Sequence, residues 1–234
     1  IIEFIQQDSY VNARTILITM NPVDIGLLFD EIPKEKLLRV FRMLPKNLAA
    51  DTFSYMRAEQ QQFIIESITD REIVNIVDEM FMDDTVDFLE EMPANIVKKV
   101  LKITDTETRK TINQLLRYPE DSAGSIMTIE YVDLKRSMTV ADAFMRIRRT
   151  GVDKETIYTC YVTDSKRKLK GVVTVKELLL ADENATIREI MEDNVISVNT
   201  WEDKEVVADL FDKYDLLALP VVDKENRLVG IITV

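Results

Sequence analysis

Histidine is absent from the 234-residue sequence, and Cys160 is its only cysteine. These two absences exclude zinc sites built from imidazoles or paired thiolates, and they exclude Cys–His nucleophile pairs and Ser–His–Asp triads. Cys160 lies in a strand-like run, where we expect a buried structural thiol. The residue inventory therefore excludes these particular metal sites and catalytic arrangements.

Long hydrophobic runs are also missing. No apolar stretch approaches the roughly 20 residues that cross a bilayer, and Ile1–Ile5 lacks the basic flank and cleavage site of a signal peptide. The sequence opens within a repeating pattern and stops on an apolar run, residues 230–234. We therefore expect a fragment of a longer protein, and a membrane domain elsewhere in that protein remains compatible with these residues.

The composition indicates a folded, acidic protein. Apolar residues make up 46% of the chain and charged residues 31%, which is typical of globular proteins, and the length favours two domains. The formal charge of -12 repels nucleic acids and attracts cations. Because carboxylates and carbonyls are the ligands on offer, hard ions such as Mg²⁺ and Ca²⁺ are the metals that fit.

The first half of the sequence repeats with a period of 12. Apolar residues close successive units at Ile32, Leu44, Met56, Ile68, Met80 and Met92, with a lapse at Thr104 and a return at Leu116. Within each unit the apolar positions have helical spacing, and Pro33, Pro45 and Pro93 suit the first turn of a new helix. Helices this short need neighbours to share a core, so we expect a superhelix of helical hairpins over residues 1–117.

Acidic residues concentrate in one part of this array. Residues 66–91 hold ten Asp and Glu against a single base, Arg71. Asp83 and Asp87 are four residues apart, which places both carboxylates on one helix face, where they repel each other unless a cation lies between them. A solvated acidic face would produce the same cluster, so these residues alone leave both interpretations open.

The second half begins with the turn-rich segment 118–125 and is itself a tandem repeat. Ile126-Met127 recurs as Ile190-Met191, and residues 161–175 recur as residues 220–234. Each copy has the pattern strand, helix, strand, turn, strand, with amphipathic helices at 141–149 and 205–213 and a further helix at 176–180 after the first copy. Paired apolar runs of this kind predict buried strands of two small α/β units.

This repeat resembles a pair of cystathionine-β-synthase (CBS) domains. The residues that carry the resemblance are L-K-G-V-V-T-V-K-E-L at 169–178 and R-L-V-G-I-I-T-V at 227–234. With Y-P-E-D-S-A-G-S-I-M-T at 118–128, Y-D-L-L-A-L-P-V-V-D at 214–223 and the helical repeat before them, the whole sequence resembles the cytosolic part of MgtE-type magnesium transporters. The expected fold class is α + α/β: an N-terminal solenoid of short helices followed by a tandem CBS-domain pair.

The resemblance implies a domain plan and a mechanism. The plan is a helical N domain (1–117), a hinge (118–125), a first CBS domain (126–189) and a second CBS domain (190–234) that is truncated at its C-terminal end. In this family, Mg²⁺ joins the N domain to a CBS homodimer and favours the closed pore of the protein's own transmembrane domain. The implied location is the cytoplasmic face of the cell membrane, as part of a multi-pass membrane protein.

The resemblance also implies ligands, one set for magnesium and one for a nucleotide. Two of the implied magnesium ligands, Ser125 and Asp212, act through backbone oxygens. The implied magnesium ligands are Asp51, Asp83 and Asp87 in the N domain, and Ser125, Asp203, Glu205, Asp212 and Asp215 in the CBS pair. ATP is a further implied ligand, with Lys176 and Glu177 at its site, although Thr159 and Leu216 stand where family members place aromatic rings around the adenine.

Two other classes of protein fit parts of the same pattern. One is a soluble CBS regulatory protein that senses a nucleotide and controls an enzyme partner. The other is an interaction scaffold whose solenoid groove holds a peptide and whose acidic residues only keep it soluble. A Mg²⁺-linked compaction separates the magnesium sensor from the scaffold, because the scaffold has no reason to change shape with the ion.

Overall fold

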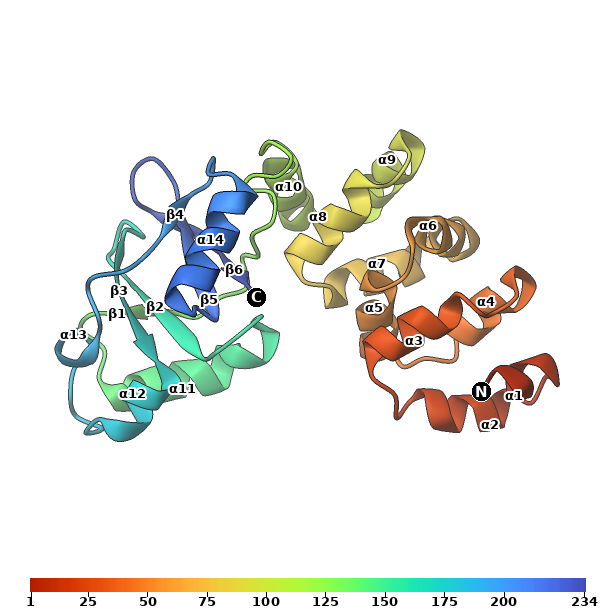
Figure 1. The fold of residues 1–234 in the computed structure, drawn as a ribbon, viewed down its shortest axis with the longest axis horizontal. Helices are drawn as coiled ribbons and strands as arrows, with labels where there is room; N and C mark the ends of the chain where they lie inside the picture. The colour runs from red at the N-terminus through yellow and green to blue at the C-terminus, as the bar shows by residue number, and fades with distance from the viewer. The chain divides into compact units, whose positions relative to one another are not determined.

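The computed structural model describes residues 1–234, which form two compact units, Ile1–Asn113 and Gln114–Val234. The first unit is helical, and the second combines helices with two small sheets (Figure 1). The expected α + α/β fold class, with a helical repeat followed by two α/β repeats, is confirmed. No helix is both long enough and apolar enough to cross a bilayer.

Unit 1 consists of short helices whose starts follow the sequence period. From α2 onward, each helix begins 12 residues after the one before it. The helices are α1 (Ile2–Gln6), α2 (Tyr10–Leu17), α3 (Pro22–Phe29), α4 (Lys34–Phe41), α5 (Lys46–Ser54), α6 (Ala58–Ser67), α7 (Asp70–Glu79), α8 (Met82–Glu90), α9 (Ala94–Ile103) and α10 (Thr106–Leu115). Helix α3 packs against α5, α5 against α7, and α7 against α9, as expected for a stack of helical hairpins.

The prolines that open the units lie one position earlier than expected. Pro33, Pro45 and Pro93 are N-cap residues with extended backbone, and the helical first turn starts at the next residue. Their carbonyls accept the first helical hydrogen bonds, for example from Lys36 at 2.8 Å and from Ala49 at 2.8 Å. Proline therefore stops the preceding turn and fixes where the next helix begins.

The core of unit 1 is built from the same repeated positions. Phe29, Phe41 and Phe53 stand 12 residues apart, are buried, and meet edge to face at centroid distances of 6.3 and 6.2 Å. Thr104, where the apolar pattern lapses, is buried all the same. In the last 12-residue repeat, which ends at the start of unit 2, Leu115 is buried in place of the expected Leu116, which is only half-buried.

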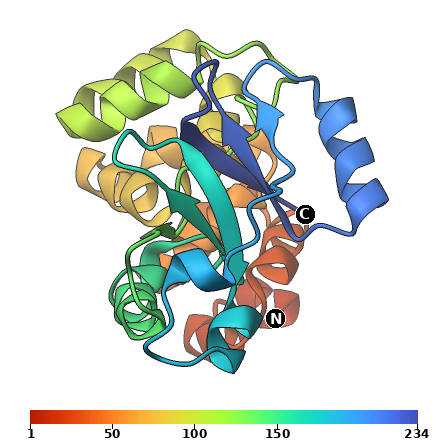
Figure 2. The same cartoon turned by 90° about the vertical axis from the view of Figure 1, so that its left-hand side faces the viewer.

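Unit 2 contains two three-stranded sheets with the same topology. The first repeat contributes β1 (Asp133–Lys135), α11 (Val140–Thr150), the 3₁₀ turn η1 (Gly151–Asp153), β2 (Thr159–Thr163), β3 (Leu169–Thr174), α12 (Val175–Leu180) and α13 (Ile187–Ile190). The second contributes β4 (Val198–Asn199), α14 (Lys204–Tyr214), β5 (Ala218–Val222) and β6 (Leu228–Thr233). In each sheet the first two strands are parallel and the last two antiparallel, so the predicted strand–helix–strand–turn–strand pattern is confirmed (Figure 2).

The two repeats exchange their N-terminal segments. Thr128 forms two backbone hydrogen bonds with Ile231 in β6, of 2.8 and 2.9 Å, and Glu192 forms two with Val172 in β3, both of 2.9 Å. Each repeat thus lends a short segment to the edge of the other repeat's sheet. The sequence repeat predicted two similar units, but this exchange between them was not visible in it.

Part of the predicted hinge, residues 118–125, is packed against the second repeat. Ser122, Ala123, Gly124 and Ser125 are buried. The amide of Ala123 donates to Glu202 O at 2.7 Å, and the amide of Gly124 donates to Thr200 O at 2.9 Å. The exposed part of the segment is therefore limited to residues 119–121, while the domain limits given above stay predictions.

Candidate metal site and small-molecule cavity

Helices α5 and α8 present the acidic residues that the sequence singled out. Asp51 lies on α5, and Asp83 and Asp87 lie one turn apart on α8, as expected from their spacing. Asp51 and Asp87 are exposed, whereas Asp83 is half-buried. We call the acidic side chains around these helices the α8 acidic surface, and its members are Asp51, Glu79, Asp83, Asp84, Asp87 and Glu91.

Asp84, Glu79 and Glu91 are the members that sequence reasoning did not single out as candidate ligands. Ser54 on α5 donates a hydrogen bond of 3.0 Å to Asp84 Oδ2, which ties the two helices together. Asp84, Asp87 and Glu91 line one cavity of about 530 Å³ beside the start of α6. Their spacing of three and four residues puts them on one helix face, so the periodicity that revealed Asp83 and Asp87 was also sufficient to find Asp84 and Glu91.

Two carboxyls of the α8 acidic surface are harder to ionise than usual. Surrounding protein removes water from Asp87 and raises its pKa, and the nearby Asp84 and Glu91 raise it further. The pKa of Asp51 is raised by desolvation and then by Asp84 and Glu79. Desolvation is the larger cause of both shifts, and the neighbouring carboxylates add to it, so positive charge placed near Asp51 and Asp87 would favour their ionised forms.

The chemistry of these oxygen ligands fits Mg²⁺, but the coordination offered by one surface is incomplete. Carboxylate oxygens are the protein ligands that hard divalent ions prefer, and Mg²⁺ keeps several waters when it uses only one or two of them. Within residues 1–234, no group of three acidic side chains is placed to hold a metal ion together. The assignment of Asp51, Asp83 and Asp87 as magnesium ligands stays a prediction.

The other expected magnesium ligands are spread around α14 and the segment that precedes the first repeat. Asp203 is the N-cap of α14, and its carboxylate accepts the Glu205 amide at 2.8 Å. Asp212 lies exposed in the last turn, and Asp215 ends the helix in the left-handed conformation with a φ of 49°. Ser125 is buried, with its hydroxyl donating to Ser122 O at 2.9 Å. The structure does not gather these five into one cluster.

A mainly apolar cavity of about 380 Å³ lies between the two repeats of unit 2. Both Thr159 and Leu216, the positions where aromatic rings were expected, line it, and so does Asp215. Thr174 also lines it and is the N-cap of α12, where the Glu177 carboxylate accepts the Thr174 amide and hydroxyl at 2.7 and 2.9 Å. Glu177 is thus engaged in a capping box next to the cavity, and Lys176 is exposed beside it.

The comparisons with known proteins cover nearly the whole sequence. Residues 20–121 match the family described as the MgtE intracellular N domain, and residues 123–184 and 187–234 match the CBS domain family. The magnesium transporter MgtE of Thermus thermophilus is 38% identical over 99% of this chain and 52% of its own length. That of Bacillus subtilis is 30% identical over 94% of this chain and 49% of its own length, so the chain spans about half the length of these curated relatives.

A solved structure agrees with these matches. The crystal structure of the cytosolic domain of the Mg²⁺ channel MgtE in complex with ATP has a TM-score of 0.93 and 37% identity, covering 99% of this chain and 95% of that one. The proteins that match over 94% or more of the chain are magnesium transporters and the cytosolic domain of one, and not enzymes. The chain therefore belongs to the MgtE family, of which it forms the part that carries the helical N domain and the two CBS domains.

Proposed function

We propose that this chain senses Mg²⁺ for a magnesium transporter or channel and acts on its pore. Bound Mg²⁺ bridges the α8 acidic surface and the acidic residues around α14, favours a compact arrangement of the N domain and the CBS domains, and so favours the closed pore. The relatives named above are magnesium transporters, and this chain spans about half of their length. In this proposal the pore lies in the other half.

The observation that supports this proposal most is the grouping of acidic side chains on α8, where Asp84, Asp87 and Glu91 line one cavity; the raised pKa of Asp51 and Asp87 agrees with it. Because each carboxyl is already opposed by Asp84, a second acidic surface can approach them only if positive charge comes with it. A small divalent ion supplies that charge and still leaves room for bridging waters. The ion favours the compact state by its differential affinity for that state, and several ions acting together make the response steep.

The test is limited proteolysis combined with Mg²⁺ titration of the whole chain. Millimolar Mg²⁺ is expected to slow cleavage at residues 119–121, the exposed part of the connecting segment. The variant Asp83→Asn/Asp87→Asn removes two charges from the α8 acidic surface and is expected to lose this protection. The control Asp24→Asn/Glu35→Gln removes two exposed charges elsewhere in unit 1 and is expected to keep it.

A wild type that is cleaved at the same rate with and without Mg²⁺ would overturn the proposal and favour the scaffold interpretation. Equal loss of protection in both variants would show that only the total charge matters and that Asp83 and Asp87 are not ligands.

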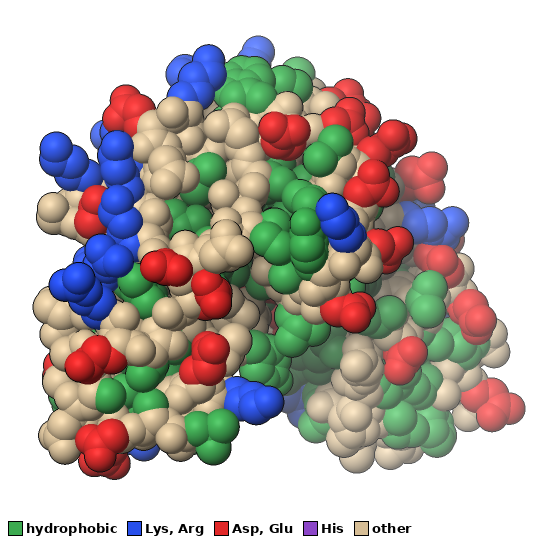
Figure 3. Space-filling view, turned by 60° about the vertical axis from the view of Figure 1, so that its left-hand side comes forward, with side chains coloured by type: hydrophobic (Ala, Val, Ile, Leu, Met, Phe, Trp, Pro, Cys, Tyr) green, Lys and Arg blue, Asp and Glu red, His purple; other side chains and the backbone are tan.

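We propose that the chain works as a homodimer joined through its CBS domains and attached to its own pore domain at the cytoplasmic face of the membrane. Unit 2 leaves large apolar side chains exposed: Leu180 is 79% exposed and Leu179 67% on α12, and Met145 is 61% exposed on α11. Figure 3 shows hydrophobic side chains at the surface beside charged ones. Sedimentation equilibrium is expected to give a dimer for the wild type and a monomer for Leu180→Glu.

A second function, nucleotide binding, is favoured by the 380 Å³ cavity between the repeats. Its size and apolar lining suit a small aromatic ligand, and a related MgtE cytosolic domain was crystallised with ATP. Thr159 and Leu216 provide less stacking surface than aromatic rings would, so we expect weak ATP binding. Thr159→Tyr is expected to tighten it in calorimetric titrations, and equal affinity in the two proteins would argue against adenine stacking at this wall.

A further inference from the structure

A second, polar cavity of unit 2 plays no part in the function proposed above. It has a volume of about 280 Å³ and is lined by Ile129, Tyr131, Asp133, Lys154, Thr163 and Arg167. The cavity lies by the ends of β1 and β2 and the hairpin that follows β2, whereas the 380 Å³ cavity includes Thr174 at the far end of β3. The two cavities share no lining residue.

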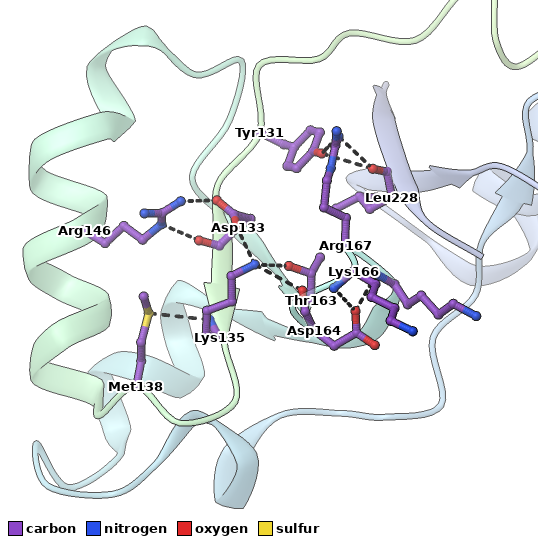
Figure 4. Close-up of polar contacts among 11 residues, drawn as sticks. Tyr131, Asp133, Lys135, Met138, Arg146, Thr163, Asp164, Lys166, Arg167 and Leu228 are labelled. Atoms are coloured by element: carbon purple, nitrogen blue, oxygen red, sulfur yellow. Dashed lines mark hydrogen bonds and ion pairs between the residues drawn. The ribbon is translucent and has the colours of Figure 1, made fainter. Parts of the chain in front are cut away.

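The one acidic side chain in this lining is already neutralised. Arg146 donates to both the carboxylate and the carbonyl of Asp133, and Lys135 forms an ion pair with its Oδ2 at 3.1 Å (Figure 4). Burial works to raise the pKa of Asp133, but these hydrogen bonds outweigh it and the pKa is lowered. The charges of Lys154 and Arg167 therefore dominate the cavity.

Arg167 is held with part of its guanidinium left for another acceptor. Its Nη2 donates to Leu228 O at 3.1 Å and to the Tyr131 hydroxyl at 3.3 Å (Figure 4). Both bonds use the same nitrogen, so the N–H groups of Nε and Nη1 are not used by them. Thr163 accepts from Lys135 at 2.6 Å, which leaves its own hydroxyl hydrogen for a further acceptor.

The fold does not require this polar set, because the second repeat has the same backbone without it. Leu134 pairs with Val162 in the first sheet, and Val198 pairs with Val221 in the second, which fixes the equivalent positions. Arg167 and its counterpart Asn226 share a positive φ, of 64° and 61°. The second repeat carries Val195 for Tyr131, Ser197 for Asp133, Val222 for Thr163 and Asn226 for Arg167.

The charge distribution along the chain also indicates that positive charge surrounds the 280 Å³ cavity. Residues 126–176 hold eleven Lys and Arg against six Asp and Glu, in a protein whose net charge is -12. Basic side chains accordingly gather along one edge of the face drawn in Figure 3. A local positive field in an acidic protein concentrates anions near the cavity.

We propose that the cavity lined by Tyr131, Lys154 and Arg167 is a binding site for a phosphate group, either inorganic phosphate or a phosphate monoester. Two cations in the lining match the charge of a phosphate dianion, and the fork of Arg167 suits two of its oxygens. Because Arg167 also holds Leu228 in β6, a phosphate bound there strengthens the link between the two repeats. The site adds an anion response to a protein whose proposed effector is a cation.

The probe is inorganic phosphate, titrated by calorimetry into the whole chain with sodium chloride added to match ionic strength. Arg167→Gln and Lys154→Gln are each expected to weaken phosphate binding about tenfold or more, since each removes a charge-assisted hydrogen bond. The control Lys166→Gln removes the same charge from the same hairpin at an exposed position outside the cavity. It is expected to change affinity by no more than about twofold, through the screened field alone.

Absence of saturable phosphate binding by the wild type would overturn the proposal. Equal weakening in all three variants would overturn it as well, because it would show that phosphate responds to the general positive field and not to a defined site. Thermal unfolding of each variant shows whether the fold is kept, and Lys154→Gln preserves the Arg167–Leu228 link if Arg167→Gln does not fold. Co-sedimentation with phosphatidic acid vesicles that needs Arg167 would identify the phosphate as that of a lipid headgroup. Phosphate binding without co-sedimentation would identify a soluble phosphate.

Discussion

At the scale of single residues, Asp51 and Asp87 are harder to ionise than ordinary aspartates, and a bound cation would favour their ionised forms. Each has a raised pKa, caused first by desolvation and then by Asp84 and a neighbouring glutamate. An acid whose pKa is higher in the folded than in the unfolded state stabilises the fold below its unfolded pKa, and this contribution is lost as pH rises through the folded pKa. At neutral pH the ionised carboxylates therefore lower the stability of the fold unless a cation is bound.

This argument predicts that Asp87→Asn acts in opposite directions with and without magnesium. In chelator at pH 7, the variant is expected to raise the free energy of unfolding of unit 1 by at most about 0.5 kcal/mol, because it removes a repelled charge. In millimolar Mg²⁺ the wild type gains stability from the bound ion and the variant gains less. Urea unfolding followed by circular dichroism measures both, and an unchanged order of stability in the two conditions would contradict the prediction.

Glu72 shows the opposite behaviour to Asp87. It accepts two hydrogen bonds from Arg42, at 2.8 and 3.0 Å, and these hold its pKa at about 2. A lowered pKa gives stability that is present above the ordinary value for glutamate and is lost as pH falls toward 2. Part of the acidic segment 66–91 is thus paired, which the count of charges could not reveal.

Glu72→Gln is accordingly expected to lower the free energy of unfolding of unit 1 by about 0.5 kcal/mol at pH 7, a small effect since the pair is partly exposed. The difference from the wild type should shrink as pH falls from 4.5 toward 2. Urea titrations at several pH values measure it, and a difference that is constant down to pH 2 would show that Arg42 does not interact with the charged form.

At the scale of helices and strands, the period of 12 determined unit 1 almost completely. The helix starts and the buried phenylalanines follow it, because a short helix and its turn repeat the same contacts with the next pair. Two predictions from this period were wrong by one residue. The prolines are N-caps and not first-turn residues, and Leu115 is buried where Leu116 was expected. Such shifts of one residue depend on backbone geometry at the turn, which hydrophobic spacing does not specify.

Phe53 is predicted to be central to this stacking. It is fully buried and meets Phe41 at 6.2 Å and Phe88 at 5.0 Å between ring centroids. Phe53→Ala should cost about 3–5 kcal/mol in the free energy of unfolding of unit 1, through lost burial and a cavity. Tyr55→Ala, two residues on and 55% exposed, serves as the control and should cost less than about 1 kcal/mol. Similar losses in both would contradict the stacked-core arrangement.

In unit 2 the repeat predicted the strands, but not the exchange of N-terminal segments between repeats, because each copy alone is consistent with a self-contained unit. The exchange brings backbone very close to Gly171 and Gly230. A Cβ atom on Gly230 would lie 2.7 Å from Thr128 O, and one on Gly171 would lie 2.8 Å from Glu192 O. These two glycines are needed so that each lent segment can reach its partner strand.

Gly171→Ala and Gly230→Ala are each expected to destabilise unit 2 by about 1–3 kcal/mol, since backbone must move to admit the methyl group. Gly151→Ala is the control, because its new Cβ meets only the side chains of Ile157 and Ile147. Thermal unfolding compares them. If the control loses as much stability as the other two, close approach of the exchanged segments is not the cause.

At the scale of the whole molecule, charge is distributed unevenly between parts of one chain. Residues 66–91 and the second repeat are acidic, while residues 126–176 are basic. The candidate ligands could be named from sequence only through the family resemblance, and their assignment stays a prediction. Helical periodicity was sufficient to place Asp83 and Asp87 on one helix face. Nothing in the local sequence relates Asp51 to Ser125 or Asp203, because these residues are far apart along the chain.

The most direct measurement is small-angle X-ray scattering of the whole chain in chelator and in millimolar Mg²⁺. If Mg²⁺ bridges the acidic surfaces, the radius of gyration falls on addition of the ion for the wild type and stays at its chelator value for Asp83→Asn/Asp87→Asn. Scattering curves of the wild type that superimpose in the two conditions would contradict magnesium-linked compaction and, with it, the proposed sensing of the ion.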